Sequence, residues 1–438
     1  MEFQQLTKKK VGFISLGCDK NRVDLERIIY AFKTAGFEIT PKYEDANIII
    51  INTCSFILDA RKESIGAILE TIPLKQLNLE KLIVTGCLNN MKYEDLQTSL
   101  PEVDLFVKVE DNEKIVELVA DLYGAKYNLS SKNKALDRII TTPKHYAYLK
   151  IADGCDNFCT YCTIPYIRGR FRSEKIEDVV NEAKNLVKIG VKEIILVAQD
   201  VTKYGTDIYG SSKLVELLQE LEKIKDLKWI RLLYCYPDLI DDRLIDEMAR
   251  NKKVCKYLDM PLQHISDPVL KTMNRRTNNV QICSIIEKLR AKIPDISIRT
   301  TFILGFPNEG EENFSELVEF VKKYRLDNVG FFKYSKEEGT PASKLKGQVP
   351  QKTKSDRLKV LSNLQYQVVK EKHTSQIGKV VECVVDEIVD NWAICHSEQL
   401  CPTVDSVIYI PSLRVNVGEF YKVRIINIRK YDYIGELL

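Results

Sequence analysis

The stretch KIADGCDNFCTYCTIPYIRGR, residues 150–170, contains three cysteines at unequal spacing, Cys155, Cys159 and Cys162. A structural zinc site is tetrahedral and takes all four of its ligands from the protein. This stretch offers only three thiols, and it contains neither a second cysteine pair nor a histidine. Three protein ligands leave one metal position open, and a bound metal performs chemistry at an open position. The stretch is therefore interpreted as a catalytic metal loop.

The metal loop opens a series of alternating strands and helices. Strand patterns occur at six points, with helical patterns between most of them: YAYLKIA, KEIILVAQ, WIRLLYCYP, YLDMPLQH, ISIRTTFILGFP and NVGFFKYS. Six β/α units fit a partial (β/α)6 barrel, similar to part of a TIM barrel, better than a flat sheet. Because the loop follows the first strand, we expect it at the C-terminal mouth of the barrel, where active sites of such folds lie.

Upstream of the loop, residues 11–17, 47–54 and 81–87 are short apolar runs that predict strands. Helical patterns from Asn21 to Ala35 and from Leu58 to Thr71 separate them. The alternation predicts an α/β domain with a doubly wound parallel sheet over residues 1–125.

Each of these three strands has a cysteine at or just beyond its C-terminal end, namely Cys18, Cys54 and Cys87. Ligands bind at those ends in an open α/β sheet, so the three thiols could converge on one metal site. One cysteine in such a place would more often be a small buried hydrophobe, but three in three strands favour a site.

The remaining domains follow from changes in pattern. Residues 126–142 are polar and predict a linker, and residues 143–373 predict the barrel domain. Residues 374–438 contain short alternating runs broken by turn residues, which predict a small antiparallel β-barrel of about five strands. From Ser375 to Leu438 there are nine acidic and six basic residues, a net charge of −3. That sign does not suit docking on a phosphate backbone, whereas it suits a basic protein partner.

Composition limits the function classes. The chain has 438 residues, 45% hydrophobic and 29% charged, with a formal net charge of +3, as in a soluble globular protein of about three domains. We see no signal peptide and no apolar run of the roughly 18 residues that a membrane span requires, so we expect a cytoplasmic protein with no membrane partner. Its twelve cysteines then belong in a reducing compartment, where metal ligation or catalysis is favoured over disulfides.

The C-x3-C-x2-C loop after the first barrel strand resembles the signature of radical S-adenosylmethionine (SAM) enzymes. A three-cysteine N-terminal domain and a small C-terminal barrel, a TRAM domain, further resemble the methylthiotransferases. The motifs SLGCDKN, NTCSFI, GCDNFCTYCTIPYIRGR, AQDVTKYG, MPLQH and FKYSKEEGT are similar to the RimO-type enzymes. The alternative is the MiaB type, which modifies a tRNA adenosine; its usual GCQMN and GQN are GCDKN and AQD here.

The resemblance implies two 4Fe–4S clusters and SAM as cofactors. Cys155, Cys159 and Cys162 would hold the cluster that cleaves SAM to a 5′-deoxyadenosyl radical. Cys18, Cys54 and Cys87 would hold a second cluster that carries the sulfur. The reaction would add a methylthio group to the β-carbon of an aspartate in a small-subunit ribosomal protein, free or bound to the ribosome. An electron donor such as flavodoxin or ferredoxin is implied, and tRNA is not favoured as a partner.

Other residues give weaker signals. Gln199 and Asp200 end a barrel strand and could bind the SAM amino group or ribose, although a polar turn is nearly as good an interpretation. His264 faces the mouth of the barrel or is a structural histidine. The three arginines of PYIRGRFRS, residues 165–173, could bind an anionic cofactor or substrate. The other six cysteines match no ligand spacing, and an RNA-binding protein with only structural cysteines would not explain six cysteines at strand ends.

Overall fold

The computed structural model describes residues 2–90, 96–127, 138–411 and 414–438. It divides into two compact units. The first contains residues 1–141 with the segments 153–156 and 162–171, and the second contains residues 142–152, 157–161 and 172–438. The metal loop is thus divided between the two units. Most of the predicted linker, residues 128–137, lies outside the described residues.

The first unit is built on a parallel sheet, as predicted. Its five strands have the order β2-β1-β3-β4-β5, and the sequence patterns indicated only β1, β3 and β4. Its strands are β1 Lys10–Ser15, β2 Glu38–Ile39, β3 Ile48–Thr53, β4 Lys81–Gly86 and β5 Leu105–Phe106. Its α-helices are α1 Phe3–Leu6, α2 Asp19–Thr34, α3 Leu58–Thr71, α4 Leu96–Ser99, α5 Ile115–Leu122 and α6 Ile164–Ile167. Its 3-10 turns are η1 Tyr43–Asp45, η2 Ile72–Gln76, η3 Cys87–Asn90 and η4 Val109–Lys114.

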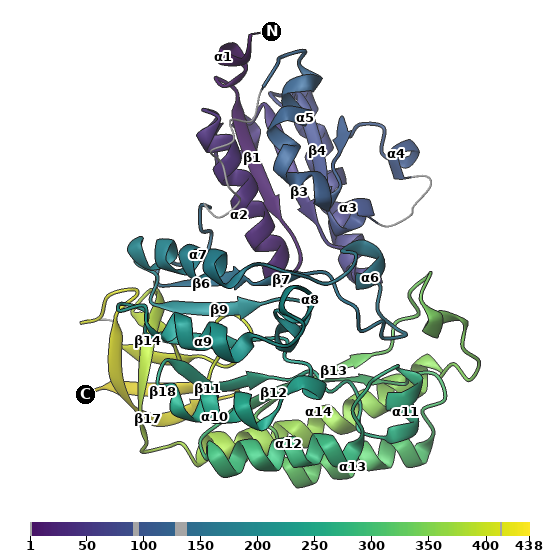
Figure 1. Cartoon of the computed structure of the whole chain (residues 1–438), viewed down its shortest axis with the longest axis vertical. Coiled ribbons are helices and arrows are strands. Elements are labelled where there is room, and N and C mark those ends of the chain that lie inside the picture. Colours follow the sequence, from purple (N-terminus) through teal and green to yellow (C-terminus); the bar gives the residue numbers. More distant parts are fainter. Residues whose placement is uncertain (1, 91–95, 128–137, 412–413) are drawn as a thin grey trace. The chain divides into compact units, whose positions relative to one another are not determined.

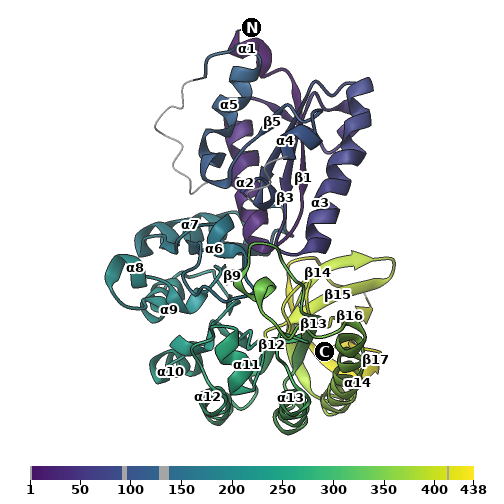
Figure 2. The same ribbon diagram turned by 90° about the vertical axis from the view of Figure 1, so that its right-hand side faces the viewer.

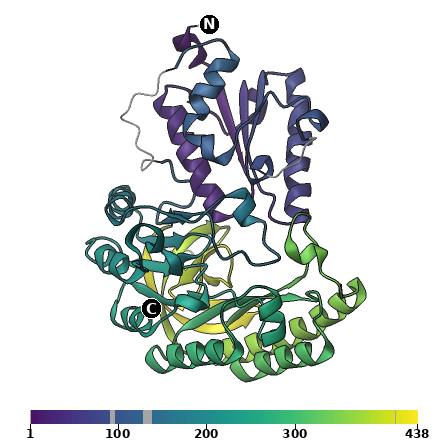
Figure 3. The same ribbon diagram turned by 45° about the vertical axis from the view of Figure 1, so that its right-hand side comes forward.

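Both faces of this sheet are buried, which is why its strands are continuously apolar. Ile48 and Ile50 of β3 pack on the side of α2 and α5, whereas Ile49 and Ile51 pack with Ile68 of α3. Side chains alternate between the two faces of a strand, so one run of four isoleucines serves two cores. The helices accordingly flank the sheet from opposite sides (Figure 3).

The second unit begins with six parallel strands in the order β13-β12-β11-β10-β9-β6. Figure 1 labels β6, β9, β11, β12 and β13 of this sheet. They are β6 Tyr146–Lys150, β9 Glu193–Val197, β10 Trp229–Leu232, β11 Val254–Asp259, β12 Ser297–Leu304 and β13 Asn328–Lys333. Short segments β7 Ala152–Asp153 and β8 Arg172–Ser173 accompany them. The strands follow the chain order without closing, which confirms the predicted partial barrel.

Helices connect these strands, and Figure 2 shows α10, α12 and α13 along one side of the sheet. The α-helices are α7 Ile176–Lys188, α8 Thr206–Tyr209, α9 Leu214–Glu222, α10 Asp242–Arg250, α11 Asp267–Thr272, α12 Asn279–Lys292, α13 Glu311–Tyr324 and α14 Gln351–Thr374. The 3-10 turns are η5 Val201–Lys203, η6 Pro237–Leu239 and η7 Pro341–Lys344. In the described part of the chain, no helix is long and apolar enough to cross a membrane.

The C-terminal strands close into a barrel of order β14-β15-β16-β18-β17. They are β14 Val380–Val389, β15 Trp392–Ser397, β16 Ile408–Pro411, β17 Phe420–Arg429 and β18 Asp432–Leu437. The predicted five-stranded barrel is confirmed, with one difference: β16 and β18 pair in parallel. Closure of the barrel brings these two strands together, and a pattern of alternating residues does not encode the direction of that pairing.

A buried ion network joins this barrel to the starts of β6 and β9. His396 contacts Glu193 through Nε2 at 2.6 Å and Asp386 through Nδ1 at 2.8 Å. His145 also contacts Asp386, and Arg231 donates to Glu193 at 2.7 Å. Each buried charge therefore has a partner, as burial requires. The network lies at the N-terminal ends of the strands, away from the end where the cysteine loop follows β6.

Candidate active site with two sets of three cysteines

The structure brings together the three cysteines of the N-terminal sheet. Cys18 precedes α2, Cys54 follows β3 and Cys87 follows β4, so all three lie at the carboxyl ends of neighbouring strands. The thiols of Cys18 and Cys54 are close enough to act electrostatically on Cys87. Gly17 has φ +90°, and a Cβ placed there would lie 2.7 Å from Cβ of Cys54. A glycine is required where these two segments meet, because an added methyl group would occupy the space of Cys54.

Burial disfavours the thiolate form of two cysteines of this set, Cys54 and Cys87. Burial raises the pKa of the Cys87 thiol to about 11, although Arg168 acts to lower it. Burial likewise raises the pKa of Cys54. Thiolates are the form that binds metal, so a bound metal ion or cluster would have to displace these protons. The donor set consists of three thiols, the ligand type that holds iron–sulfur clusters.

The spacing of the sulfur atoms fits a cluster better than one zinc ion. Tetrahedral Zn–S bonds of about 2.3 Å place thiolates about 3.8 Å apart. Among the described residues, only His145, Asp386 and His396 form a group of three potential ligands within 4.8 Å of one another. The sulfur atoms of Cys18, Cys54 and Cys87 are therefore spread more widely. An iron–sulfur cubane holds its thiolates further apart, because each binds a different iron.

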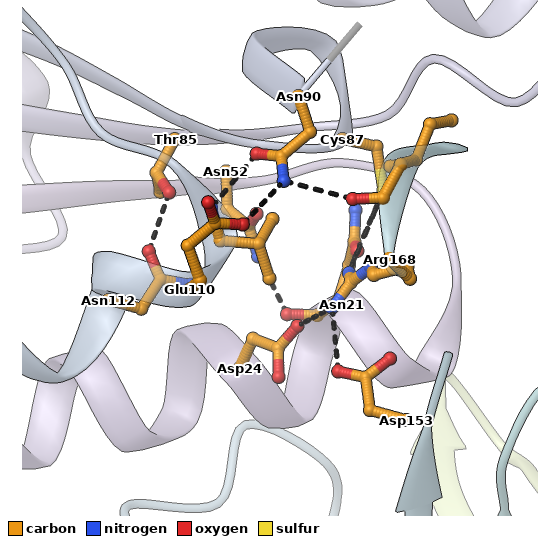
Figure 4. Close-up of polar contacts among 12 residues, drawn as sticks. Asn21, Asp24, Asn52, Thr85, Cys87, Asn90, Glu110, Asn112, Asp153 and Arg168 are labelled. Atoms are coloured by element: carbon orange, nitrogen blue, oxygen red, sulfur yellow. Dashed lines mark hydrogen bonds and ion pairs between the residues drawn. The ribbon is translucent and has the colours of Figure 1, made fainter. Parts of the chain in front are cut away.

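Arg168 and Asn21 form a polar group beside Cys87, and Figure 4 shows both side chains directed toward it. Arg168 Nη2 lies 3.6 Å from the Cys87 sulfur and also donates to Oδ1 of Asn21. The Asn21 amide donates to the carbonyl oxygens of Leu16 and Thr53, so it joins the ends of β1 and β3. The sequence interpretation missed Asn21 and assigned Arg168 to an anionic cofactor or substrate instead. The only signal for Arg168 was its place in the arginine-containing run after the loop.

Two loop cysteines belong to the first unit, Cys155 and Cys162. The backbone N–H of Cys155 donates to the carbonyl oxygen of Gly169 at 3.1 Å, and the N–H of Ile164 donates to the Cys162 sulfur at 3.4 Å. Gly154 has φ +79°, and a Cβ there would lie 2.1 Å from the carbonyl oxygen of Arg170. The chain thus folds back on itself so closely that only glycine fits before Cys155.

Cys159, the middle cysteine of the loop, belongs to the second unit, where a buried arginine lies beside it. Nη1 of Arg275 is 4.0 Å from the Cys159 sulfur, and its guanidinium stacks 3.7 Å from the ring centroid of Tyr236. Hydrogen bonds to sulfur and nearby charge are the means by which a protein tunes an iron–sulfur centre.

Asp200 supports the loop from β9. Its carboxylate accepts a hydrogen bond of 2.8 Å from the amide of Asn157 and one of 2.6 Å from the hydroxyl of Thr202. Asp200 is fully buried, and Gln199 beside it is half-buried. These contacts make Asp200 a support for the backbone between Cys155 and Cys159. Direct contact of Gln199 or Asp200 with SAM stays a prediction.

His264 is a buried structural histidine. Its Nδ1 accepts a hydrogen bond from the N–H of Ser266, and burial lowers its pKa to about 3, so it remains neutral. The neighbouring glycine-containing run is held by Glu309, whose carboxylate accepts from the N–H groups of Gly305 and Phe306. All twelve cysteines are free. Of the six without ligand spacing, Cys283 is half-buried and the others are buried, as expected for structural residues: Cys235, Cys255, Cys383, Cys395 and Cys401.

Three protein families match successive segments of the chain. They are the Uncharacterized protein family UPF0004 over residues 10–108, the Radical SAM superfamily over residues 149–321 and the TRAM domain over residues 377–438. Two solved radical SAM enzymes share the fold at low identity. The methyltransferase TsrM from Kitasatospora setae has a TM-score of 0.56 at 14% identity and covers 76% of this chain and 77% of its own. The cobalamin-dependent enzyme OxsB has a TM-score of 0.53 at 12% identity, with 84% and 58% covered.

Curated relatives match along the full length. The ribosomal protein uS12 methylthiotransferase RimO of Clostridium tetani is 46% identical over 439 residues, covering 98% of both chains. The same enzyme of Acetivibrio thermocellus is 46% identical over 447 residues, covering 98% of this chain and 99% of its own. That of Thermoanaerobacter is 44% identical over 435 residues, covering 98% and 100%. On these full-length matches and the three matched domains, the chain belongs to the RimO family of radical SAM methylthiotransferases.

Proposed function

We propose that this protein adds a methylthio group to the β-carbon of an aspartate in ribosomal protein uS12. The observation that carries the proposal is the full-length match to RimO enzymes at 44 to 46% identity. The matched length includes both cysteine sets and the C-terminal barrel. The alternative of a tRNA adenosine as substrate is not favoured, since the relatives named above act on uS12.

Radical SAM methylthiotransferases use two 4Fe–4S clusters and SAM. In this chain, Cys18, Cys54 and Cys87 would hold one cluster, and Cys155, Cys159 and Cys162 would hold the other. When bound, these groups supply the reductive cleavage of SAM and the sulfur that is transferred. Each set has three cysteines and therefore leaves one iron without a protein ligand, where SAM or the sulfur would bind.

The chain's own residues position these groups. Asp200 holds Asn157 and thereby the loop between Cys155 and Cys159, and Gln199, next to it at the end of β9, would contact SAM. Gly17 and Gly154 allow the backbone approaches that set the first cysteine of each trio. An electron must come from outside the protein, and a small carrier such as flavodoxin or ferredoxin would supply it. The substrate would be free uS12 or uS12 in the ribosome.

The charge of the C-terminal barrel does not select the substrate by itself. All six of its basic residues are exposed, whereas only five of its nine acidic residues are: Glu382, Glu387, Asp390, Glu419 and Glu436. Asp386 is bound to His145 and His396, and Asp405 lies 3.4 Å from Arg299. The net charge of the sequence is therefore not displayed as an acidic surface. The choice of uS12 over tRNA depends on the relatives rather than on electrostatic steering.

The proposal is tested by offering the reconstituted enzyme uS12 and unmodified tRNA separately, with SAM and a reductant. We expect a mass gain of one methylthio group on uS12, located on an aspartate by fragment mass spectrometry. Cys54→Ala should give no such product, whereas Cys283→Ala, which changes a half-buried cysteine outside both sets, should retain it. Methylthiolation of the tRNA with none on uS12 would contradict the proposal and favour the alternative.

A further inference from the structure

Two arginines in the run after the metal loop differ in the exposure of their side chains. The side chain of Arg168 is 2% exposed, whereas that of Arg170 is 75% exposed and pairs with Asp156 at 3.2 Å. Burying a guanidinium is costly unless it is paired. The burial of Arg168 therefore requires partners for its guanidinium group, and these partners indicate its role.

Arg168 contacts residues of α2, the cysteine that follows β4 and the segment before the metal loop. Its Nη1 donates to Asp24 at 2.6 Å and to Asp153 at 3.1 Å. Its Nη2 donates to Asn21 and lies 3.6 Å from the Cys87 sulfur. Figure 4 shows this arrangement. An external anion such as the SAM carboxylate would have to displace these partners, so the arginine does not serve the anionic cofactor or substrate that the sequence suggested.

The short segment that carries Arg168 is fixed. The carbonyl oxygen of Ile167, the last residue of α6, accepts a hydrogen bond of 2.9 Å from Asn90, and Asn90 ends the turn η3 that begins at Cys87. Oδ1 of the same Asn90 accepts from the N–H of Val109. Arg168 and Cys87 are thus held on two segments that are bonded to each other, and their separation is set by the fold.

From this geometry we propose that Arg168 tunes the redox potential of the cluster held by Cys18, Cys54 and Cys87; the proposal rests on the function proposed above. A hydrogen bond from a cation to a ligating sulfur withdraws electron density, and a nearby positive charge stabilises the state with one more electron. Arg168 would therefore make the cluster easier to reduce. Asp24 and Asp153 would limit this effect, because each offsets part of the positive charge.

The proposal makes two predictions of opposite sign. Arg168→Met removes the charge and the N–H donor, so the midpoint potential should fall, and Arg168→Lys should give a smaller fall because it keeps the charge. Asp24→Asn leaves the arginine in place with one counter-charge fewer, so the potential should rise. Loss of the Asp24 carboxylate also acts directly on the cluster, so the rise in Asp24→Asn is interpreted together with the fall in Arg168→Lys, which keeps every carboxylate in place.

The experiment uses the full chain with Cys155, Cys159 and Cys162 all changed to Ala, so that one cluster remains. The protein is reconstituted with iron and sulfide, its iron is counted, and its one-electron reduction by dithionite is titrated by electron paramagnetic resonance. Arg170→Met is the matched control and should not shift the potential. If Arg168→Met fails to fold, Asp24→Asn and Arg168→Lys decide the matter.

Unchanged potentials in Arg168→Lys and Asp24→Asn, with iron bound, would overturn the proposal and leave the proposed function intact. A parent protein that binds no iron would overturn both, because the ligand assignment itself would then be wrong. A potential that moves equally in Arg170→Met would also count against Arg168, since general surface charge would then explain the shift.

Discussion

The two cysteine sets are built in different ways. Cys155, Cys159 and Cys162 lie within eight residues of one another in a single loop, whereas Cys18, Cys54 and Cys87 come from the ends of three parallel strands. Each set has a positive-φ glycine directly before its first cysteine and a buried arginine beside one sulfur, Arg168 at 3.6 Å and Arg275 at 4.0 Å. The loop set is local and visible as a motif. The strand set depends on the sheet.

Three features recur in both sets although the local structures of the sets differ. Because three thiols, a close backbone approach and one buried arginine recur in both sets, they are not by-products of one local structure. The sets also share sequence: Arg168 follows the loop cysteines but contacts Cys87 of the strand set. The effect of a substitution in one set should therefore be compared with the effect of the matching substitution in the other set.

The largest expected effect is on iron content. Changing Cys18, Cys54 and Cys87 together to Ala should remove one cluster, and so should changing Cys155, Cys159 and Cys162, leaving about half of the iron in each case. Iron and sulfide analysis after anaerobic reconstitution measures this. Cys283→Ala should retain all the iron. If either triple variant keeps the full complement, that set does not hold a cluster.

The second effect separates the tasks of the two sets. Cys159→Ala should abolish release of 5′-deoxyadenosine from SAM with dithionite, since a cubane without one of its three anchors does not stay intact. Cys54→Ala should keep this release and lose methylthiolation of uS12. Both products are measured by mass spectrometry. Release that persists in Cys159→Ala, or that vanishes in Cys54→Ala with the loop cluster intact, would contradict the division.

A smaller effect is expected at the two glycines. In Gly17→Ala the added carbon would meet Cys54 at 2.7 Å, and in Gly154→Ala it would meet the Arg170 carbonyl at 2.1 Å. Each variant should bind less iron. Gly17→Ala should lower the iron content when Cys155, Cys159 and Cys162 are alanine, and Gly154→Ala should lower it when Cys18, Cys54 and Cys87 are alanine.

Gly190→Ala is the matched control for these glycines. Gly190 has φ +106° but nothing within 4 Å of the added carbon, so the change should cost about 1 to 2 kcal/mol of stability and no iron. An equal loss of iron in all three variants would show that backbone strain, and not the approach to the cysteines, is responsible.

The smallest effect on iron content is expected from the ion network at the N-terminal ends of β6 and β9. Burial disfavours the charged form of His396, but Glu193 and Asp386 raise its pKa from 6.5 to about 9. The ion pairs of protonated His396 therefore make their full contribution to the free energy of unfolding below pH 6.5. That contribution is lost as the pH rises through 9, where the folded protein also loses the proton. The stability advantage of the native protein over His396→Gln should therefore be larger at pH 6 than at pH 9.

Urea unfolding of both proteins at the two pH values measures that advantage, and iron analysis accompanies it. Iron content should not change, since the network lies at the N-terminal ends of β6 and β9 and contains no cysteine. An advantage that is independent of pH would refute the role of the His396 charge. A loss of iron would show that the network and the cysteine sets are not independent.

The sequence predicted much of this protein because most of its signals are local. The alternation of apolar runs and helical patterns predicted both parallel sheets, and the shorter runs after residue 374 predicted the small barrel. Strand-end positions also predicted that Cys18, Cys54 and Cys87 would meet, since parallel strands present their carboxyl ends along one edge. The C-x3-C-x2-C spacing could be recognised from the sequence alone, because its three cysteines are close together in the chain.

Only the tertiary structure decided what surrounds the cysteines. Arg168 is one of three arginines in a short run, and nothing in that run distinguishes the buried one from the exposed Arg170. Its partners Asp24 and Cys87 are 144 and 81 residues away in the chain. The charge of the C-terminal barrel shows the same dependence on the fold. Composition counts Asp386 and Asp405 as free charges, whereas in the structure Asp386 pairs with His145 and His396, and Asp405 lies beside Arg299. Periodicity and spacing report on neighbours along the chain, whereas charge pairing and burial depend on neighbours in space.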